Sequence, residues 1–138
     1  MKKEKRTDAQ IFVLCYKKVD YNIPNNSLYT PLQCGSEINK ENVCDVKDNT
    51  LDNISEKNEC FAELTGTYWL WKNVCKNYKY IGQCQYRRQM LLNETTDFDS
   101  LFKHYDIICG VPLRFGATVY QQYDKCHNID DLILIQKK

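Results

Sequence analysis

One continuous apolar run and one helical repeat dominate the hydrophobic pattern of the chain. Residues 10–16 (QIFVLCY) form a continuous apolar run, which is typical of a buried strand in a parallel sheet. Residues 80–86 (YIGQCQY) predict a second strand, and residues 105–109 (YDIIC) predict a third. We therefore expect a sheet built from segments that are distant in sequence.

The clearest helical pattern begins at Phe61. Apolar side chains then recur at steps of three and four and form one stripe, made of Phe61, Leu64, Tyr68, Trp71 and Cys75. Trp69 and Leu70 lie off this stripe, so we expect a well-buried helix that is apolar on more than one side. Asn58 is its predicted N-cap.

Shorter segments complete the pattern. Helical turns are expected within 29–39 and at 101–105, and a longer helix is expected from Ala117 onward. The polar, acidic stretch 41–53 predicts a long loop. The resulting order is strand, helix, helix, strand, strand, helix, which predicts an α/β fold with a mostly parallel sheet.

Length and composition fit one folded domain. The chain has 138 residues, of which 43% are hydrophobic and 27% charged, with only 5 Gly and 3 Pro. We expect residues 1–9 to form a disordered basic N-terminus and residues 10–138 to form the domain. Residues 132–135 resemble the middle of an element, so we expect the domain to be truncated at the C-terminus.

Net charge and cysteine spacing indicate which partners, which cellular compartment and which thiol state to expect. The net charge is +1, from 19 basic and 18 acidic side chains, which provides no overall field to attract nucleic acid. The sequence shows neither a signal-peptide core nor an apolar stretch that could span a bilayer, so a cytoplasmic location is expected. The 8 cysteines are widely and irregularly spaced, which favours reduced, buried thiols over disulfides or a zinc site.

Polar side chains follow two of the predicted strands. Tyr16 ends the first strand, and Arg87 and Arg88 follow the second. Ligands of open α/β sheets bind outside the carboxyl ends of the strands, and guanidinium groups bind phosphate oxygens. A phosphate site is one interpretation, and a solvated or salt-bridged arginine pair is the other.

Three further groups could carry chemistry. Residues 52–57 precede the main helix and could hold an anion through backbone N–H groups, although a simple capping segment is favoured by local chemistry. Asp97 and Asp99 form an Asp-x-Asp that could chelate Mn²⁺ or Mg²⁺, although acids in a first helical turn are the favoured explanation. His127 could act as a base or as a hydrogen-bond donor to phosphate.

Five motifs occur in register along the chain: D-N-I-S-E-K-N at 52–58, E-L-T at 63–65, Y-W-L-W-K-N at 68–73, Y-I-G at 80–82 and Y-R-R at 86–88. Together they resemble one bacterial family, the glycosyltransferases of capsular and exopolysaccharide biosynthesis. The resemblance runs from about Ile11 to the end of the chain. None of the motifs is specific alone, whereas the set is specific.

The resemblance implies a GT-A-like nucleotide-binding fold and transfer of a sugar from a nucleotide-sugar donor, expected to be a UDP-sugar, to a glycan acceptor. It also implies peripheral association with membrane polysaccharide machinery. Together with the strand-end position of Tyr16, it gives the candidate donor-binding residues as Tyr16, Asp52, Asn53, Lys57, Tyr86, Arg87 and Arg88. It makes His127 the candidate catalytic residue, near the pyrophosphate or the acceptor.

One departure from the family pattern keeps an alternative open. Gln85 stands where the family has a histidine before Tyr-Arg-Arg, and glutamine cannot act as an acid or a base. The alternative is a non-catalytic, truncated remnant that binds nucleotide weakly or serves only as an interaction module. Mn²⁺ and Mg²⁺ are the candidate cofactors, but the arginines could replace a metal electrostatically, so metal independence is predicted.

Overall fold

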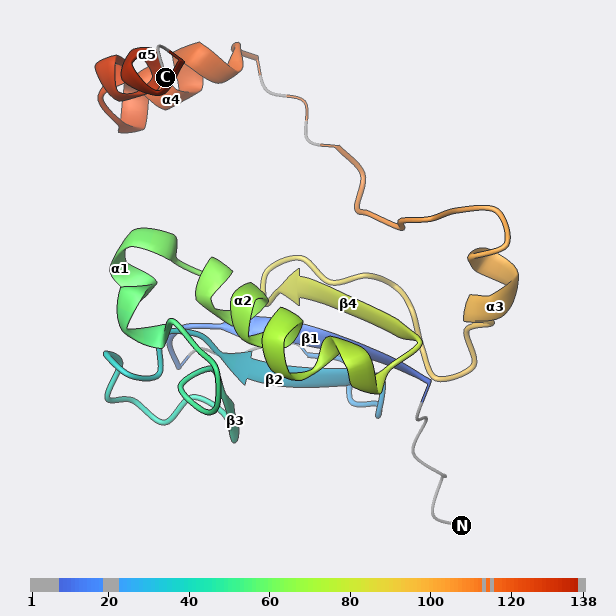
Figure 1. Ribbon diagram of the computed structural model, residues 1–138. Helices are drawn as coiled ribbons and strands as arrows, with labels where there is room; N and C mark the ends of the chain where they lie inside the picture. The colour runs from blue at the N-terminus through green and yellow to red at the C-terminus, as the bar shows by residue number, and fades with distance from the viewer. Residues whose placement is uncertain (1–7, 19–22, 113, 115, 137–138) are drawn as a thin grey trace. The chain divides into compact units, whose positions relative to one another are not determined.

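A computed structural model describes residues 8–18, 23–112, 114 and 116–136. The chain divides into two compact units, Met1–Ile107 and Ile108–Lys138. The first unit contains a four-stranded parallel sheet with the order β3-β2-β1-β4 (Figure 1). The strands are β1 Ala9–Cys15, β2 Tyr29–Gln33, β3 Val46–Lys47 and β4 Tyr80–Gln85. The predicted α/β class with a parallel sheet is therefore confirmed, and the arrangement is consistent with a GT-A-like fold.

Strand β1 is central and buried along its whole length. It pairs in parallel with β2 on one side and with β4 on the other. Ile11 and Val13 belong to one hydrophobic core, and Phe12 and Leu14 belong to a second core. Because alternate side chains of a strand point to opposite faces, both faces must be covered. This double burial explains why the run 10–16 is apolar without interruption.

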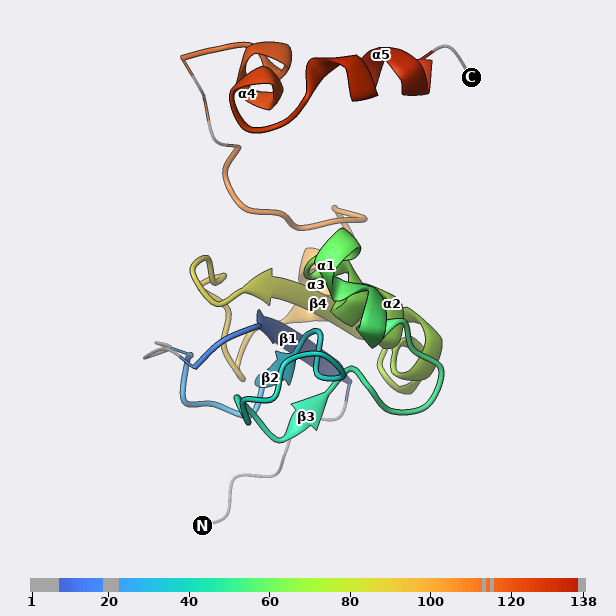
Figure 2. The ribbon, with the colours of Figure 1, turned by 90° about the vertical axis from the view of Figure 1, so that its left-hand side faces the viewer.

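The helices of the first unit are short. They are η1 Ser55–Lys57, α1 Asn58–Phe61, α2 Leu64–Asn73, η2 Cys75–Asn77 and α3 Phe98–Leu101. Helix α2 lies along one face of the sheet, as Figure 2 shows, and packs Trp69 and Leu70 into the core that contains Phe12. The other core is closed in part by Phe98 of α3.

The second unit contains α4 Val119–Cys126 and α5 Ile129–Gln136. Thr118 caps α4, because its side chain accepts from the Gln121 N–H while the Gln121 side chain accepts from the Thr118 N–H. The helix predicted from Ala117 onward is therefore confirmed. None of the helices in the described ranges combines the length and the apolar character that a bilayer span requires.

The predicted apolar stripe of the main helix is not the face that the helix buries. Leu64 is 56% exposed and Trp71 is 60% exposed. The helix instead buries Thr65, Gly66, Trp69 and Leu70. A Cβ at Gly66 would lie 2.5 Å from the Cys34 sulfur, so the helix approaches β2 on the side of its smallest residues. The spacing of apolar residues shows that a helix has an apolar face, but it does not show which face has side chains small enough to approach a sheet closely.

The start of this helix also differs from the prediction. Lys57, not Asn58, is the N-cap of α1, and the Asn58 side chain is buried. The helix is then interrupted at Ala62, where φ is 47° and ψ is −131°. These angles are unfavourable for a residue with a Cβ, so other contacts must hold the interruption in place.

Three further predictions need correction. Within 29–39, Tyr29–Gln33 is a strand rather than helical turns, because it pairs with β1. No strand forms at 105–109, where Ile107 is 79% exposed and the chain is irregular. The helical turn expected at 101–105 occurs earlier, as α3. The loop predicted for 41–53 is confirmed apart from the two residues of the edge strand β3.

The remaining expectations concern the terminus and the thiols. Most of the predicted N-terminal segment, residues 1–7, lies outside the described residues, and Ala9 already belongs to β1. None of the eight cysteines, all of which lie in the described ranges, forms a disulfide. The predicted burial is wrong for three of them, because Cys60, Cys109 and Cys126 are exposed. The single domain expected at 10–138 stays a prediction.

Candidate functional site

The strand order creates a ligand position between β1 and β4. From β1 the chain moves outward through β2 and β3, and it then returns to β4 on the opposite side of β1. Connections that diverge in this way leave a crevice outside the carboxyl ends of the two strands. Leu14 pairs with Gln85 near these ends, so the loops that leave β1 and β4 begin side by side.

A pocket of about 430 Å³ lies at this position. Its volume falls within the range of about 300–1,000 Å³ that is usual for small-molecule sites. The walls come from the ends of β1 and β4, from the residue after β2, and from the junction of α1 with α2. The lining residues are Leu14, Cys15, Tyr16, Cys34, Asn58, Glu59, Ala62, Glu63, Gln85, Tyr86 and Arg87.

Three of the predicted donor-site residues meet in this pocket: Tyr16, Tyr86 and Arg87. The Arg87 Nε donates to the Tyr86 hydroxyl oxygen at 2.9 Å, and the guanidinium carbon lies 5.1 Å from the centre of the Tyr86 ring. These contacts restrain the Arg87 side chain beside the pocket. Arg88 is exposed and does not line the pocket, and its backbone N–H donates to the Gln85 carbonyl at 2.9 Å to close the turn after β4.

The other predicted donor-site residues, Asp52, Asn53 and Lys57, are not among the pocket-lining residues. The Tyr68 hydroxyl donates to the Asp52 carboxylate at 3.0 Å, and the Asn73 amide donates to the Asp52 carbonyl at 2.8 Å. The hydrogen bond to Asp52 raises the pKa of Tyr68. The contacts of Asp52 therefore tie the loop before α1 to α2.

Asn53 makes local hydrogen bonds rather than lining the pocket, and Lys57 does not line it either. The Asn53 side chain accepts from the Ser55 N–H at 3.1 Å and donates to the Leu51 carbonyl at 2.9 Å. Lys57 is an exposed residue at the end of η1. His127 belongs to the second unit, where it ends α4 and its ring centre lies 4.8 Å from that of Tyr123.

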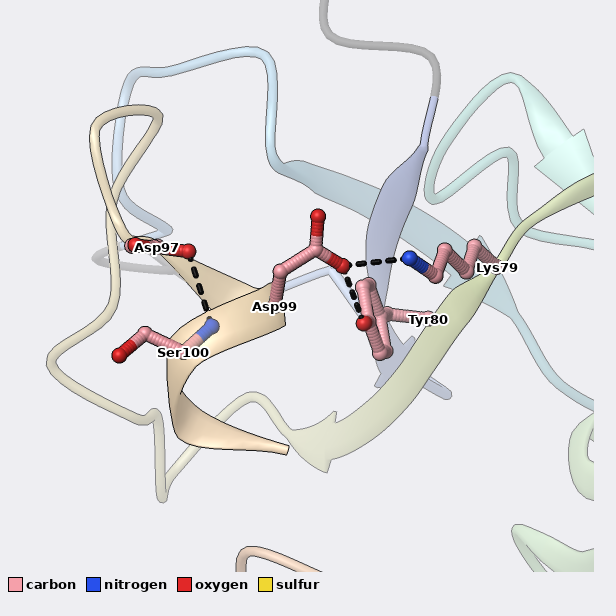
Figure 3. Close-up of polar contacts among 5 residues, drawn as sticks. All are labelled: Lys79, Tyr80, Asp97, Asp99 and Ser100. Atoms are coloured by element: carbon pink, nitrogen blue, oxygen red, sulfur yellow. Dashed lines mark hydrogen bonds and ion pairs between the residues drawn. The ribbon is translucent and has the colours of Figure 1, made fainter. Parts of the chain in front are cut away.

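Asp97 and Asp99 are engaged in local contacts, as Figure 3 shows. Asp97 caps α3 by accepting from the Ser100 N–H at 3.0 Å. One oxygen of Asp99 accepts from Lys79 Nζ and from the Tyr80 hydroxyl, both at 2.5 Å. The Lys79 contact, followed by the Tyr80 contact, lowers the pKa of Asp99. Within the described ranges, no group of three or more His, Cys, Asp or Glu residues is arranged to hold a metal ion.

A buried polar network lies behind the pocket and is centred on Asp48, which has no exposed surface. Its carboxylate accepts from the backbone N–H groups of Gly35 and Ser36, at 2.8 and 3.0 Å. It also accepts from the hydroxyls of Ser55 and Thr65, at 2.6 and 2.7 Å. Four hydrogen bonds to one buried carboxylate fix the loop after β2, the start of η1 and the first turn of α2 relative to one another.

The same network supports the interruption at Ala62. Asn58 Nδ2 donates to the Thr65 hydroxyl at 2.9 Å and to the Ala62 carbonyl at 2.6 Å. Gly35, at φ +67°, lies so close that a Cβ there would come within 2.5 Å of Asn58 Cγ. The unfavourable backbone of Ala62 is thus held by buried contacts, and it forms part of the pocket wall.

Residues 10–138 match the family model for a domain of unknown function, DUF4422. The chain belongs to the DUF4422 family. No curated protein matches it significantly. The apo structure of the bifunctional glycosyltransferase WbbM is similar at 28% identity with a TM-score of 0.48, covering 58% of this chain and 14% of that one. At that TM-score the likeness is too limited to assign a fold or an activity to the DUF4422 chain.

Two polar pocket residues of the DUF4422 chain that contact each other, Glu63 and Gln85, are among the lining residues that were not proposed from the sequence. Gln85 stood out only as a departure from a motif, and Glu63 only as part of E-L-T. The Gln85 side-chain amide donates to one oxygen of the Glu63 carboxylate, so the two side chains are in contact at the pocket. Their positions within the motifs were the available signal, because nothing in local periodicity places them together.

The pocket wall also contains a thiol, Cys34. Burial, followed by the nearby Asp48 carboxylate, raises the pKa of Cys34 far above its ordinary value. A thiol that stays protonated is a poor nucleophile and a poor metal ligand. Cys34 therefore contributes packing rather than chemistry to the pocket.

Proposed function

We propose that this DUF4422 chain is a glycosyltransferase domain that transfers a sugar from a UDP-sugar donor to a capsular or exopolysaccharide glycan. The proposed setting is the cytoplasm, beside the membrane machinery that assembles the glycan. The observation that carries the proposal is the pocket at the β1–β4 switch point, where Tyr16, Tyr86 and Arg87 meet.

The chemistry of these three residues suits a nucleoside diphosphate. Tyrosine rings offer flat apolar faces on which a base can stack, and their hydroxyls offer hydrogen bonds. A guanidinium group binds phosphate oxygens in a planar, two-pronged geometry. Arg87, held against Tyr86, would bind the diphosphate and stabilise the negative charge that develops on it when the sugar leaves.

Arg87 also bears on the metal question. Its positive charge could serve where other enzymes use Mn²⁺ or Mg²⁺, so we propose that donor binding is independent of metal. Asp52, Asn53, Lys57, Arg88 and His127 stay predictions as donor-site or catalytic residues.

The test is a calorimetric titration of the full chain with UDP, with and without Mn²⁺. We expect saturable binding that weakens about tenfold or more in Arg87→Ala, because a charged hydrogen bond to phosphate is lost. Lys79→Ala is the matched control, because Lys79 is an exposed cation at the other end of β4. A folded wild-type chain that does not bind UDP contradicts the proposal, and a strict Mn²⁺ requirement contradicts its metal-independent form.

A second candidate function is a non-catalytic module that associates with a partner. The observation that favours it is the exposed apolar surface on α1 and α2, where Phe61, Leu64 and Trp71 are 45%, 56% and 60% exposed. Sedimentation of the chain with and without UDP separates the two candidates. Self-association that disappears in Leu64→Ser, together with no UDP binding, would favour the module.

A further inference from the structure

The polar groups of the pocket are divided between two walls. Arg87, from the turn after β4, is the cation of the lining, whereas the two carboxylates of the lining, Glu59 and Glu63, come from α1 and from its junction with α2. Glu63 accepts from Gln85 rather than from Arg87. A diphosphate would be attracted to Arg87 and repelled by Glu63, so the Glu63 wall suits a neutral ligand group that donates hydrogen bonds.

The carboxylate of Glu63 retains capacity for such a group. An ionised carboxylate has about four acceptor positions on its two oxygens, and Gln85 uses one of them. Glu63 is half-buried, so a ligand in the pocket would shield its hydrogen bonds from bulk water. Sugar hydroxyls are neutral donors of the required kind.

The backbone fixes where this carboxylate lies. Glu63 directly follows Ala62, whose positive φ is held by the buried Asn58 and Thr65. Backbone strain of this kind persists only where surrounding contacts enforce it. Its consequence here is a fixed position for Glu63 beside Gln85.

From these contacts we infer that Glu63 is a specificity-determining residue that accepts hydrogen bonds from the hydroxyls of a hexose in the pocket, with Gln85 as its positioning residue. The inference rests on the proposed function, because that function brings a hexose to this pocket. The hexose could belong to the donor, next to the diphosphate, or to the acceptor glycan. Both share the chemistry that Glu63 would recognise.

The experiment compares the wild type with Glu63→Gln and Glu56→Gln. Glu56 is an exposed glutamate of η1 that does not line the pocket, so its variant controls for the loss of one negative charge. One arm titrates UDP, UDP-glucose and UDP-galactose by calorimetry. The other arm measures saturation transfer to methyl glucoside and methyl galactoside by NMR. The first arm reports a donor hexose and the second an acceptor hexose.

In the donor arm a UDP-hexose should bind more tightly than UDP, or in the acceptor arm a methyl glycoside should bind. In the arm that responds, Glu63→Gln should weaken the affinity that the hexose contributes by about tenfold, as expected for a lost hydrogen bond to a charged group. UDP itself should bind Glu63→Gln as well as it binds the wild type. Gln85→Ala should give a smaller loss of the same kind, and it keeps the test sound if Glu63→Gln does not fold. Glu56→Gln should match the wild type in both arms.

Two failures are distinguishable. If UDP binds but the hexose contribution is absent, or is the same in the wild type and in Glu63→Gln, the inference is wrong and the proposed function stands. If a folded wild type binds no UDP, the proposed function is wrong for uridine donors. The methyl glycoside arm then decides alone, and no signal, or a signal unaffected by Glu63→Gln, overturns the inference.

Discussion

The two ends of strand β4 use similar side chains in opposite ways. At the amino end, Lys79 and Tyr80 both donate to one oxygen of Asp99. At the carboxyl end, Arg87 donates to Tyr86 and both residues line a pocket. At the amino end the Asp99 carboxylate accepts from both the cation and the phenol. At the carboxyl end, within the described part of the chain, only Nε of Arg87 is engaged, so its guanidinium retains donors that a ligand in the pocket can use. The partners of the side chains, rather than their types, distinguish a structural contact from a candidate site.

The two ends also differ in what supports them. The side chains of Lys79 and Asp99 are 61% and 62% exposed, so their attraction is weakened by water and salt. The pocket end is backed by the buried carboxylate of Asp48 and its four hydrogen bonds. Substitutions behind the pocket should therefore have much larger effects than substitutions at the amino end of β4.

The largest effect is expected for Asp48→Ala. The change leaves four donors, three of them in buried hydrogen bonds, without their acceptor, and we expect it to lower the free energy of unfolding by about 3 kcal/mol or more. Because a small domain has only about 5–15 kcal/mol in total, the loss should be visible in urea denaturation followed by circular dichroism. UDP binding should weaken as well, because Asn58 and Ala62 lose their support. A loss of less than about 1 kcal/mol would show that the network is not needed for stability.

Part of this comparison was accessible from the sequence. The apolar run of β1 could be recognised because a strand that is covered on both faces and paired on both sides needs continuous apolar residues. Strand β4 lies at the edge of the sheet, and its residues alternate between half-buried and exposed. Tyr16 and Arg87 followed from the rule that ligands bind beyond the ends of such strands. The strand β2 was missed because its local pattern is compatible with helical turns, and its pairing with β1 decides the outcome.

The rest of the site depends on contacts that no local pattern encodes. Asp48 lies in a stretch that was correctly predicted as mostly loop, but its burial comes from donors supplied by three other segments. The interruption at Ala62 falls inside a helical pattern with no glycine or proline to mark it. Glu63 depends on that interruption for its position, so it could not be placed from periodicity.

A smaller effect of opposite sign is expected for Ala62→Gly. Glycine has no Cβ and adopts a positive φ without steric cost, so the change should relieve about 1–3 kcal/mol of backbone strain. It also makes the unfolded chain more flexible, which costs about 0.4–1 kcal/mol. We expect a net stabilisation of about 1 kcal/mol, measured by urea denaturation.

A matched control for this prediction is Ala9→Gly, at a buried β1 position where φ is not among the positive values. That change should destabilise, because glycine weakens a strand. If Ala62→Gly destabilises the chain to the same extent, the junction is not strained, and the account of how Glu63 is positioned fails.

The smallest effect is expected at the amino end of β4, for Asp99→Asn. Lys79, and then Tyr80, hold the folded-state pKa of Asp99 below its ordinary value. A depressed pKa means that the ionised carboxylate stabilises the fold at pH above the unfolded-state value of about 3.9. That contribution is lost as the pH falls through the folded-state pKa. The stability difference between the wild type and Asp99→Asn should therefore be small and constant near neutral pH, and should shrink below about pH 4.

Thermal unfolding from pH 3 to pH 7, at low and at high salt, measures this difference. High salt should reduce it at neutral pH, because an exposed ion pair is screened. The affinity for UDP should be the same in Asp99→Asn as in the wild type, because Asp99 lies at the end of β4 opposite to the pocket. A large, salt-independent loss of stability, or a loss of UDP binding, would mean that the two ends of β4 are not separate in function, and the comparison would have to be abandoned.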